Sequence, residues 1–325
     1  MSRHILATGQ TFCADASGAR IPCAGTGQDA ETAPGIPSGA DRFRVRGETV
    51  LDAATGLTWL RDANAPGFPL AWQEAFDFIE DMNAKELAGN DDWRLPDRRE
   101  LFSLVSFDAH SPALPPGHPF ENVFSGWYWT ATNSAMHAAQ AWHVHFMGGR
   151  MFWGTKTGYE LVWPVRGMTD VLPAVSPASP LGVPWPEPRF VPEGGAVRDG
   201  LTGLAWTRSA DLAPGPVSWE EAFAVAARLN RERHAGLDNW RLPTIRELDS
   251  LTDASTHTPA LCPGHPFTDT REAYWSSTNS AYEPGWAMCH YLHKGATGVG
   301  FKLDRGFHVW AVSDPDPNPP AGLGR

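Results

Sequence analysis

The sequence predicts an α+β protein made of two tandem domains of one architecture, each with two helices and a small, mostly antiparallel sheet. The main observation is a repeat: Trp93–Leu101 (WRLPDRREL) recurs as Trp240–Leu248 (WRLPTIREL), displaced by 240 − 93 = 147 residues. Four further pairs share this displacement: Trp59 with Trp206, Trp72 with Trp219, His118 with His265, and Trp163 with Trp310. Helical and alternating apolar patterns also occur at matching places. Such a chain is one structural unit written twice.

The first helix of each copy is predicted from apolar residues at helical spacing. One face of the first copy carries Trp72, Ala75, Phe76, Ile79 and Met82, and Trp219, Ala222, Phe223, Ala226 and Leu229 repeat it. In the second copy, Ser218 and Glu221 have the spacing of a capping box, in which each side chain satisfies a free amide of the first turn.

The second helix follows the Trp-Arg-Leu-Pro stretch. Thr244 and Glu247 have capping-box spacing, as do Asp97 and Glu100. We therefore expect structural roles for six residues: Trp93, Arg94, Glu100, Trp240, Arg241 and Glu247. A ligand carboxylate gripped by Arg94 and Arg241 is the alternative, because a guanidinium binds carboxylates bidentately.

Strands are predicted before the first helix and after the second. Asp52 and Asp199 precede Thr-Gly pairs, which favours tight turns over metal ligation. Later strands are expected at 128–132, 141–146 and 162–165, with the first of these matched by 274–278. Between 141 and 146, alternation predicts a buried face of Trp142, Val144 and Phe146 and an exposed face of His143 and His145.

The repeat divides the chain into five parts. We expect an N-terminal arm at 1–40 that docks on the first domain or on a neighbouring molecule, domains at 41–168 and 189–313, a Pro-rich linker at 169–188 and a tail at 314–325. A disulfide between Cys13 and Cys23 is physically reasonable; for Cys262 and Cys289, a bridge and free thiols both stay open. The sequence contains neither a membrane-spanning apolar run nor the apolar region of a signal peptide.

Charge and composition argue against several partners. The net charge is −11 and no Lys/Arg run occurs, which makes nucleic acid a poor partner. Each copy has two His in one loop but no third ligand at metal spacing, so no metal site is predicted. Asn90–Asp92 and Asp238–Asn239 could bind calcium, but surface solvation explains both clusters, and no cofactor is predicted.

The combined motifs resemble the Lcl C-terminal domain family. The resemblance rests on Asp-x-x-Thr-Gly-Leu-x-Trp, Asp-x-Trp-Arg-Leu-Pro-x-x-Arg-Glu-Leu, Tyr-Trp-(Ser/Thr)-(Ser/Ala)-Thr and Val-x-Pro-Val-Arg, and it covers both copies. The second copy departs from the last motif with Val309-Trp310-Ala311-Val312-Ser313. The resemblance implies a C-type-lectin-like fold and an exported, surface-displayed adhesion protein, in one case toward sulphated glycans. The acidic charge of this chain would repel such polyanions.

We therefore predict a non-enzymatic recognition or adhesion protein whose two domains present loop faces to a glycan or protein ligand. The candidate ligand-binding residues follow the Tyr-Trp strands, where the copies diverge: Asn133, His137, His143 and His145 in the first copy, and Asn279, Tyr282, Glu283, His290 and His293 in the second. Drift in a surface loop explains the divergence equally well.

Two alternatives remain open. The chain could be a structural subunit of a surface appendage or phage-like particle, forming homo-oligomers through its arm. It could also be an oxidase of the formylglycine-generating type, which needs a reactive Cys pair; Cys262 and Cys289 are the one pair within a domain, and the first copy lacks both.

Overall fold

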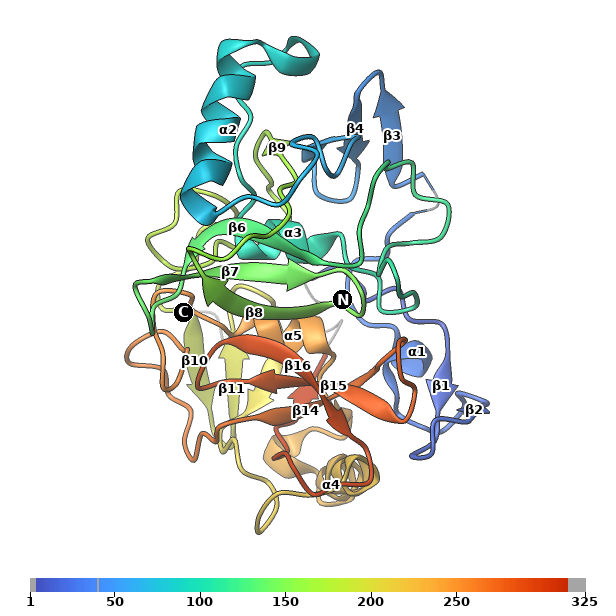
Figure 1. The fold of residues 1–325 in the computed structure, drawn as a ribbon. Helices are drawn as coiled ribbons and strands as arrows, with labels where there is room; N and C mark the ends of the chain where they lie inside the picture. Colours follow the sequence, from blue (N-terminus) through green and yellow to red (C-terminus); the bar gives the residue numbers. More distant parts are fainter. Residues whose placement is uncertain (1–3, 40, 315–325) are drawn as a thin grey trace.

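The computed structural model describes residues 4–39 and 41–314 and places two α+β domains in tandem. Figure 1 shows the long helices α2 and α4 at opposite ends of the molecule, with a central sheet between them and the β3–β4 hairpin beside α2. The α-helices are α1 (Asp29–Thr32), α2 (Trp72–Ala84), α3 (Arg98–Ser103), α4 (Trp219–Arg231) and α5 (Ile245–Ser250), and the 3₁₀ turns are η1 (Leu87–Gly89) and η2 (His234–Gly236).

Each copy begins with an antiparallel hairpin whose sheet is completed by the closing strand of the same copy. In the first copy the order is β3-β4-β5-β9, and in the second it is β10-β11-β12-β17-β13. The strands are β3 (Phe43–Arg46), β4 (Thr49–Asp52), β5 (Thr58–Leu60), β9 (Val165–Arg166), β10 (Phe190–Glu193), β11 (Ala196–Asp199), β12 (Ala205–Thr207), β13 (Trp240–Arg241) and β17 (Val312–Ser313). Asp52 and Asp199 close the turns and also bind the buried Arg42 and Arg189.

A six-stranded sheet joins the copies in the order β14-β15-β16-β8-β7-β6. Its strands are β6 (Trp127–Asn133), β7 (Gln140–His145), β8 (Arg150–Thr155), β14 (Tyr274–Asn279), β15 (Trp286–Tyr291) and β16 (Ala296–Phe301). Met151 of β8 pairs antiparallel with Thr297 of β16. Met151 and Thr297 occupy equivalent positions in the two copies, because their residue numbers differ by 297 − 151 = 146, as do those of the repeated Tyr128 and Tyr274. Antiparallel pairing of equivalent residues relates the copies by a local pseudo-two-fold axis.

Helices α3 and α5 face each other across the same axis. Arg99 donates to the carbonyls of Ser250 and Thr252, at 3.2 and 2.6 Å. Arg246, its equivalent, donates to Ser103 and Val105, at 3.2 and 2.7 Å. Beside this symmetric exchange the copies differ: Arg98 forms a buried ion pair with Asp249 at 2.7 Å, whereas their equivalents Ile245 and Phe102 lie in one apolar cluster. The copies therefore form one internal dimer.

The expected helix caps and core are present. The Asp97, Ser218 and Thr244 side chains accept from the amides of Glu100, Glu221 and Glu247, each completing a capping box. The repeated Trp pairs Trp59–Trp163 and Trp206–Trp310 are fully buried, with ring centroids 5.8 and 5.3 Å apart. Large buried rings anchor each core.

The lead-in segments of the two copies are also equivalent. In the first, the Ala7 amide donates to the Ile36 carbonyl and the Ile36 amide donates to the Ile5 carbonyl. In the second, Ala174 donates to Val183 and Val183 donates to Leu172 in the same pattern. The loop enclosed is long in the first lead-in (8–35) and short in the second (175–182). The long loop carries the Cys13–Cys23 disulfide, the strands β1 (Cys13–Ala14) and β2 (Arg20–Ile21), and α1. We call residues 8–35 the arm loop.

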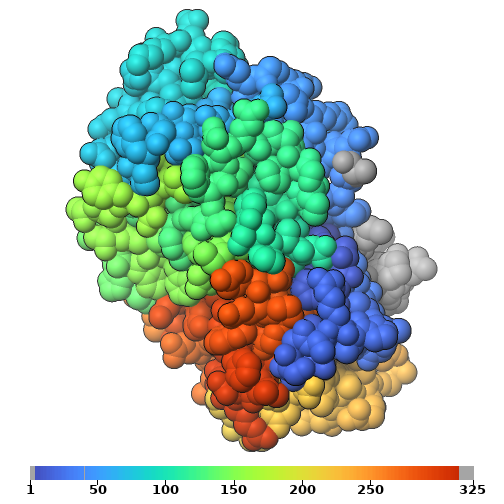
Figure 2. Space-filling model, turned by 45° about the vertical axis from the view of Figure 1, so that its right-hand side comes forward, coloured from blue at the N-terminus to red at the C-terminus, as the bar shows by residue number. Residues whose placement is uncertain are grey.

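The arm loop lies mainly on the second copy. It starts beside the first copy, where Thr11 contacts Asp108, and then crosses to β14. Figure 2 shows this blue segment packed against the orange and red second copy. The expectation that the arm docks on the first domain is therefore wrong for most of its length. The pseudo-two-fold explains the result, because it brings the first lead-in next to the strand ends of the other copy.

Candidate functional site

The same three side chains meet at one end of the shared sheet in each copy. In the first copy, Lys156 Nζ lies 2.6 Å from Asn133 Oδ1 and 4.3 Å from the centre of the Trp72 ring. Lys302, Asn279 and Trp219 are the equivalents, and the corresponding distances are 2.6 and 4.1 Å. Both indoles donate to a carbonyl of the neighbouring strand, Thr130 or Ser276. We call these the first-copy site and the second-copy site.

The arm loop fills the second-copy site. Lys302 Nζ donates to the carbonyls of Ala14 and Asp15, both at 3.1 Å. The carboxamide of Gln10 brackets the backbone of Asn279, accepting from its amide at 2.8 Å and donating to its carbonyl at 2.9 Å. The Asn279 side chain also donates to Gln28 at 2.8 Å. Nearly every polar group at the strand end is thus satisfied by the arm loop, as burial requires.

A carboxylate completes this contact. Asp29 of α1 accepts from the Thr278 hydroxyl at 2.5 Å and is 1% exposed. Burial raises the pKa of Asp29 to about 6, against the opposing effect of the Thr278 hydrogen bond. Burial lowers the pKa of Lys302 to about 7. Both shifts follow from the exclusion of water by the arm loop.

Among the residues that the structure describes, no segment covers the first-copy site as the arm loop covers the second. Asn133 is exposed and Thr132 and Lys156 are half-buried, whereas Asn279, Thr278 and Lys302 are all buried. Lys156 Nζ turns back to the carbonyl of Ala138 at 2.9 Å. The lead-in loop of the second copy, 175–182, is the symmetry-equivalent of the arm loop and is 20 residues shorter (28 against 8). It packs near the contact between the two copies, which we call the seam. There the Val175 carbonyl accepts from the backbone amide of Ala254.

His143 and His145 form a second cluster, on the other side of β7 from Trp142. The prediction that they are exposed is wrong: they are 6% and 7% exposed, because Trp127 stacks on both rings at 4.0 and 4.4 Å. His143 Nδ1 lies 3.4 Å from Glu160 Oε1. Burial, and secondarily the charge of Arg150, lowers the pKa of His145 to about 4. The alternation does place Trp142, Val144 and Phe146 on a buried face, but the opposite face, with His143 and His145, is covered as well.

The other candidate ligand residues do not share a site. His290 is fully buried and lies 3.1 Å from the Thr252 hydroxyl, so it does not face an external ligand, while His293 is half-buried. His137 is exposed beside Trp153. Tyr282 and Glu283 line a small hollow of about 100 Å³ at the seam, together with Met147, Gly148, Arg150, Ser280 and Val299.

The residues given structural roles make internal contacts. Arg94 binds Glu100 through two hydrogen bonds of 2.6 Å, and Arg241 binds Glu247 at 2.7 and 2.8 Å. The indoles of Trp93 and Trp240 donate to the carbonyls of Leu87 and His234. Arg241 also forms an ion pair with Asp314, and at the equivalent position Arg94 donates to the Gly167 carbonyl at 2.8 Å.

Cys262 and Cys289 are free thiols that pack in different apolar clusters, and burial raises the pKa of each. Cys262 lines a groove of about 410 Å³ between the linker and a loop of the second copy, with Trp185, Arg189 and His265. Because the thiolate is the nucleophilic form, a raised pKa makes both thiols poor nucleophiles at neutral pH.

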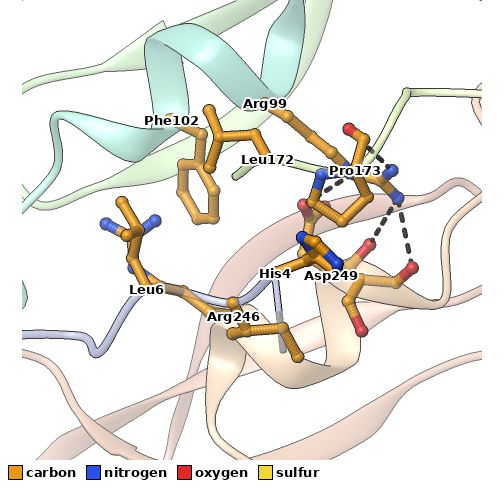
Figure 3. A pocket seen from close by; sticks show the side chains of 10 residues that line it. His4, Leu6, Arg99, Phe102, Leu172, Pro173, Arg246 and Asp249 are labelled. Atoms are coloured by element: carbon orange, nitrogen blue, oxygen red, sulfur yellow. Dashed lines mark hydrogen bonds and ion pairs between the residues drawn. The ribbon is translucent and has the colours of Figure 1, made fainter. Parts of the chain in front are cut away.

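The space between the copies is small. Figure 3 shows Arg99 reaching from α3 toward backbone carbonyls, with Phe102, Leu172 and Arg246 around a cavity of about 30 Å³. This volume has room for roughly one or two water molecules. Among residues 4–39 and 41–314, no group of three or more His, Cys, Asp or Glu is placed to hold a metal ion. The helices of this same part include none long and apolar enough to cross a membrane.

These features define a tandem α+β repeat protein with two equivalent strand-end sites, one filled and one open. The Lcl C-terminal domain family matches residues 48–166 and 195–313, which together are more than half of the chain, and the protein belongs to that family. The match confirms the resemblance drawn from the sequence motifs. Neither the search of curated proteins nor that of solved structures returned a match.

Asn133 and Asn279 are among the residues that the sequence predicts, whereas Lys156 and Lys302 are not. The signal was present, because Lys156 and Lys302 differ by 146, as Asn133 and Asn279 do. An exposed Lys is ordinary in a surface strand, however, and the repeat gave no sign that the arm loop would fill one of the two sites.

Proposed function

We propose that this protein is a non-enzymatic recognition protein that binds its ligand through the first-copy site. The observation that carries the proposal is the contrast between equivalent sites: Asn133, Lys156 and Thr132 keep the groups that hold the arm loop in the second copy, but leave them accessible. Polar groups with a proven binding geometry and no internal partner chain are candidates for an external ligand.

The chemistry of the site favours a ligand rich in oxygen acceptors. The Lys156 ammonium and the Thr132 hydroxyl donate, and the Asn133 carboxamide both donates and accepts. Carbonyls, hydroxyls and single carboxylates would all fit, as found in polypeptides and neutral glycans. A densely anionic glycan fits poorly, because the net charge of −11 opposes its approach.

An extracellular or cell-surface location is part of the proposal. The Cys13–Cys23 disulfide supports it, since such bonds persist in oxidising compartments. An adhesive role at a surface would agree with this location.

We propose no catalytic role. The two free thiols lie apart and have raised pKa values, which gives no support to an oxidase that depends on a Cys pair. A structural subunit in an assembly is the second candidate. That function would need an arm that joins neighbouring molecules, whereas the arm loop binds its own chain.

Arrays of glycans and peptides, probed with the intact chain with calcium and with chelator, test the proposal. We expect saturable binding that Asn133→Ala and Lys156→Ala weaken at least tenfold and that chelator leaves unchanged. Lys85→Ala, at an exposed lysine just after α2, is the matched control and should bind normally. Binding that survives both site substitutions would refute the assignment of the first-copy site, and a blank array would favour the structural-subunit alternative.

A further inference from the structure

We infer that the ligand of the first-copy site is a looped polypeptide segment of a partner protein, with the chemistry of the arm loop. This inference rests on the proposed function and narrows it from any oxygen-rich ligand to a polypeptide. The second-copy site holds the arm loop through a defined set of groups, the first copy keeps their equivalents, and no segment within residues 4–39 and 41–314 fills them.

The second-copy site recognises backbone and carboxamide groups. Two consecutive carbonyls, of Ala14 and Asp15, accept from Lys302. The Gln10 carboxamide pairs with the Asn279 backbone like a neighbouring strand, and Asp29 binds the hydroxyl at the strand end. A segment that recognises a sheet end in this way gains affinity from main-chain hydrogen bonds and specificity from a few side chains.

The first copy keeps the receiving groups of this contact. Thr132, Asn133 and Lys156 stand at the positions of Thr278, Asn279 and Lys302. On the adjoining helices, Phe223 of α4 lies beneath Gly27 of the arm loop, and its equivalent Phe76 of α2 is half-buried. The backbone around the lysine is also the same in both copies: the Lys156 amide donates to the Ala139 carbonyl, and the Lys302 amide donates to the Gly285 carbonyl.

One residue close to the turn of the arm loop differs between the copies. Gly18 of the arm loop approaches Gly285 so closely that a Cβ on Gly18 would lie 2.7 Å from the Gly285 amide nitrogen. The first copy has Ala139 in place of Gly285. A Cβ at position 285 would lie 3.6 Å from the nearest arm-loop atom, the Ser17 carbonyl oxygen, which is an ordinary contact, so the methyl group of Ala139 leaves room for a segment that turns as the arm loop does.

Exchange of arms between identical chains would bring no net gain. An arm loop that left its own second-copy site to fill a first-copy site elsewhere would expose Asn279 and Lys302 for each Asn133 and Lys156 it covered. A partner segment without an intramolecular site has no such cost. We therefore assign the site to a segment of a different protein.

The test uses a synthetic peptide of residues 7–36, closed by its Cys13–Cys23 disulfide, as the probe. Calorimetric titration into the intact chain is expected to show one binding site per molecule, because the second-copy site is filled internally. Ala139→Gly should leave binding unchanged, because a methyl group at the equivalent position 285 would make only ordinary contacts with the arm loop. Lys156→Ala should weaken it at least tenfold, and Lys85→Ala should leave it unchanged.

A chain in which 175–182 replaces residues 8–35 provides the positive control. It opens the second-copy site, so the stoichiometry should rise from one to two. If this chain binds one peptide and the intact chain and its Ala139→Gly variant bind none, the inference is overturned. If the shortened chain fails to fold, the intact chain and its three point variants still decide the question. Glycan binding at Asn133 and Lys156 without peptide binding would overturn this inference and leave the proposed function standing.

Discussion

The two strand-end sites carry the same Trp, Asn and Lys, yet one is part of the protein interior and the other is surface. Asn279 and Lys302 are buried under the arm loop, whereas Asn133 is exposed and Lys156 half-buried. The difference comes from the length of the lead-in loops, 8–35 against 175–182, rather than from the sites themselves. In a duplicated chain, a loop elsewhere in the sequence can thus determine whether a site present in both copies is buried or accessible.

The largest expected loss of stability comes from a substitution at the seam, the contact between the copies that lets one lead-in reach the other copy. Asp249 is the carboxylate beside Arg98 and Arg99, and it is 4% exposed. Asp249→Ala leaves two buried guanidinium groups without it and should destabilise the protein by about 3–5 kcal/mol. Urea unfolding measures the change. A loss below about 1 kcal/mol would mean that the seam does not depend on this ion pair.

A matched pair of substitutions tests the contrast between the sites. Asn279→Ala removes partners of Gln10, Gln28 and Lys302 inside the protein and should cost about 2–4 kcal/mol, because each unsatisfied buried polar group costs about 1–3 kcal/mol. Asn133→Ala, at the equivalent exposed position, should change stability by less than about 0.5 kcal/mol. Equal losses in thermal or urea unfolding would remove the distinction between filled and open sites.

Removal of the disulfide tests how the arm loop is held in shape. Cys13 and Cys23 close a loop with a sequence separation of 10. Replacing both by Ser should cost roughly 2–3 kcal/mol by releasing chain entropy in the unfolded arm. Proteolysis should then cut the arm loop faster, while cleavage near residues 130–160 stays the same. An unchanged cleavage rate in the arm would show that docking alone fixes it.

The smallest effect concerns pH. The pKa of Asp29 is about 6 in the docked arm, against an ordinary value of 3.8, with Glu247 and Arg241 as its charged neighbours. The docked state therefore binds more protons between these values, so this contribution is fully present below about pH 4 and is lost as pH rises through 6. Asp29→Asn should remove the dependence and stabilise docking at pH 7 by about 1–3 kcal/mol. Urea midpoints of both proteins at pH 4.5 and 7 measure the effect; parallel shifts would contradict it.

The features of the fold that are local, or that recur in both copies, could be predicted from the sequence. The spacing of Asp97 and Glu100 predicted a capping box, and the displacement of Trp59 and Trp163 to Trp206 and Trp310 predicted two copies of one core. The α+β class follows from the same patterns. These features depend on neighbours within one turn or on positions repeated in both copies.

Long-range packing could not be predicted in the same way. The burial of His143 on β7 depends on Trp127, which lies on the neighbouring strand β6 and stacks on the His143 ring. Alternation alone cannot say whether the second face of a sheet is covered. The pairing of Met151 with Thr297 depends on how the copies meet, and it determines which site the arm loop reaches. A single sequence holds no local signal for either contact.

Amine-reactive labelling followed by mass spectrometry tests the central claim most directly. Only amines that the reagent can reach are labelled, and Lys302 is buried under the arm loop whereas Lys156 is half-buried. We predict that Lys156 is labelled and Lys302 protected in the intact chain, and that replacing 8–35 by 175–182 makes Lys302 reactive without changing Lys156. Equal labelling of both lysines in the intact chain would contradict the claim that one site is filled and the other open.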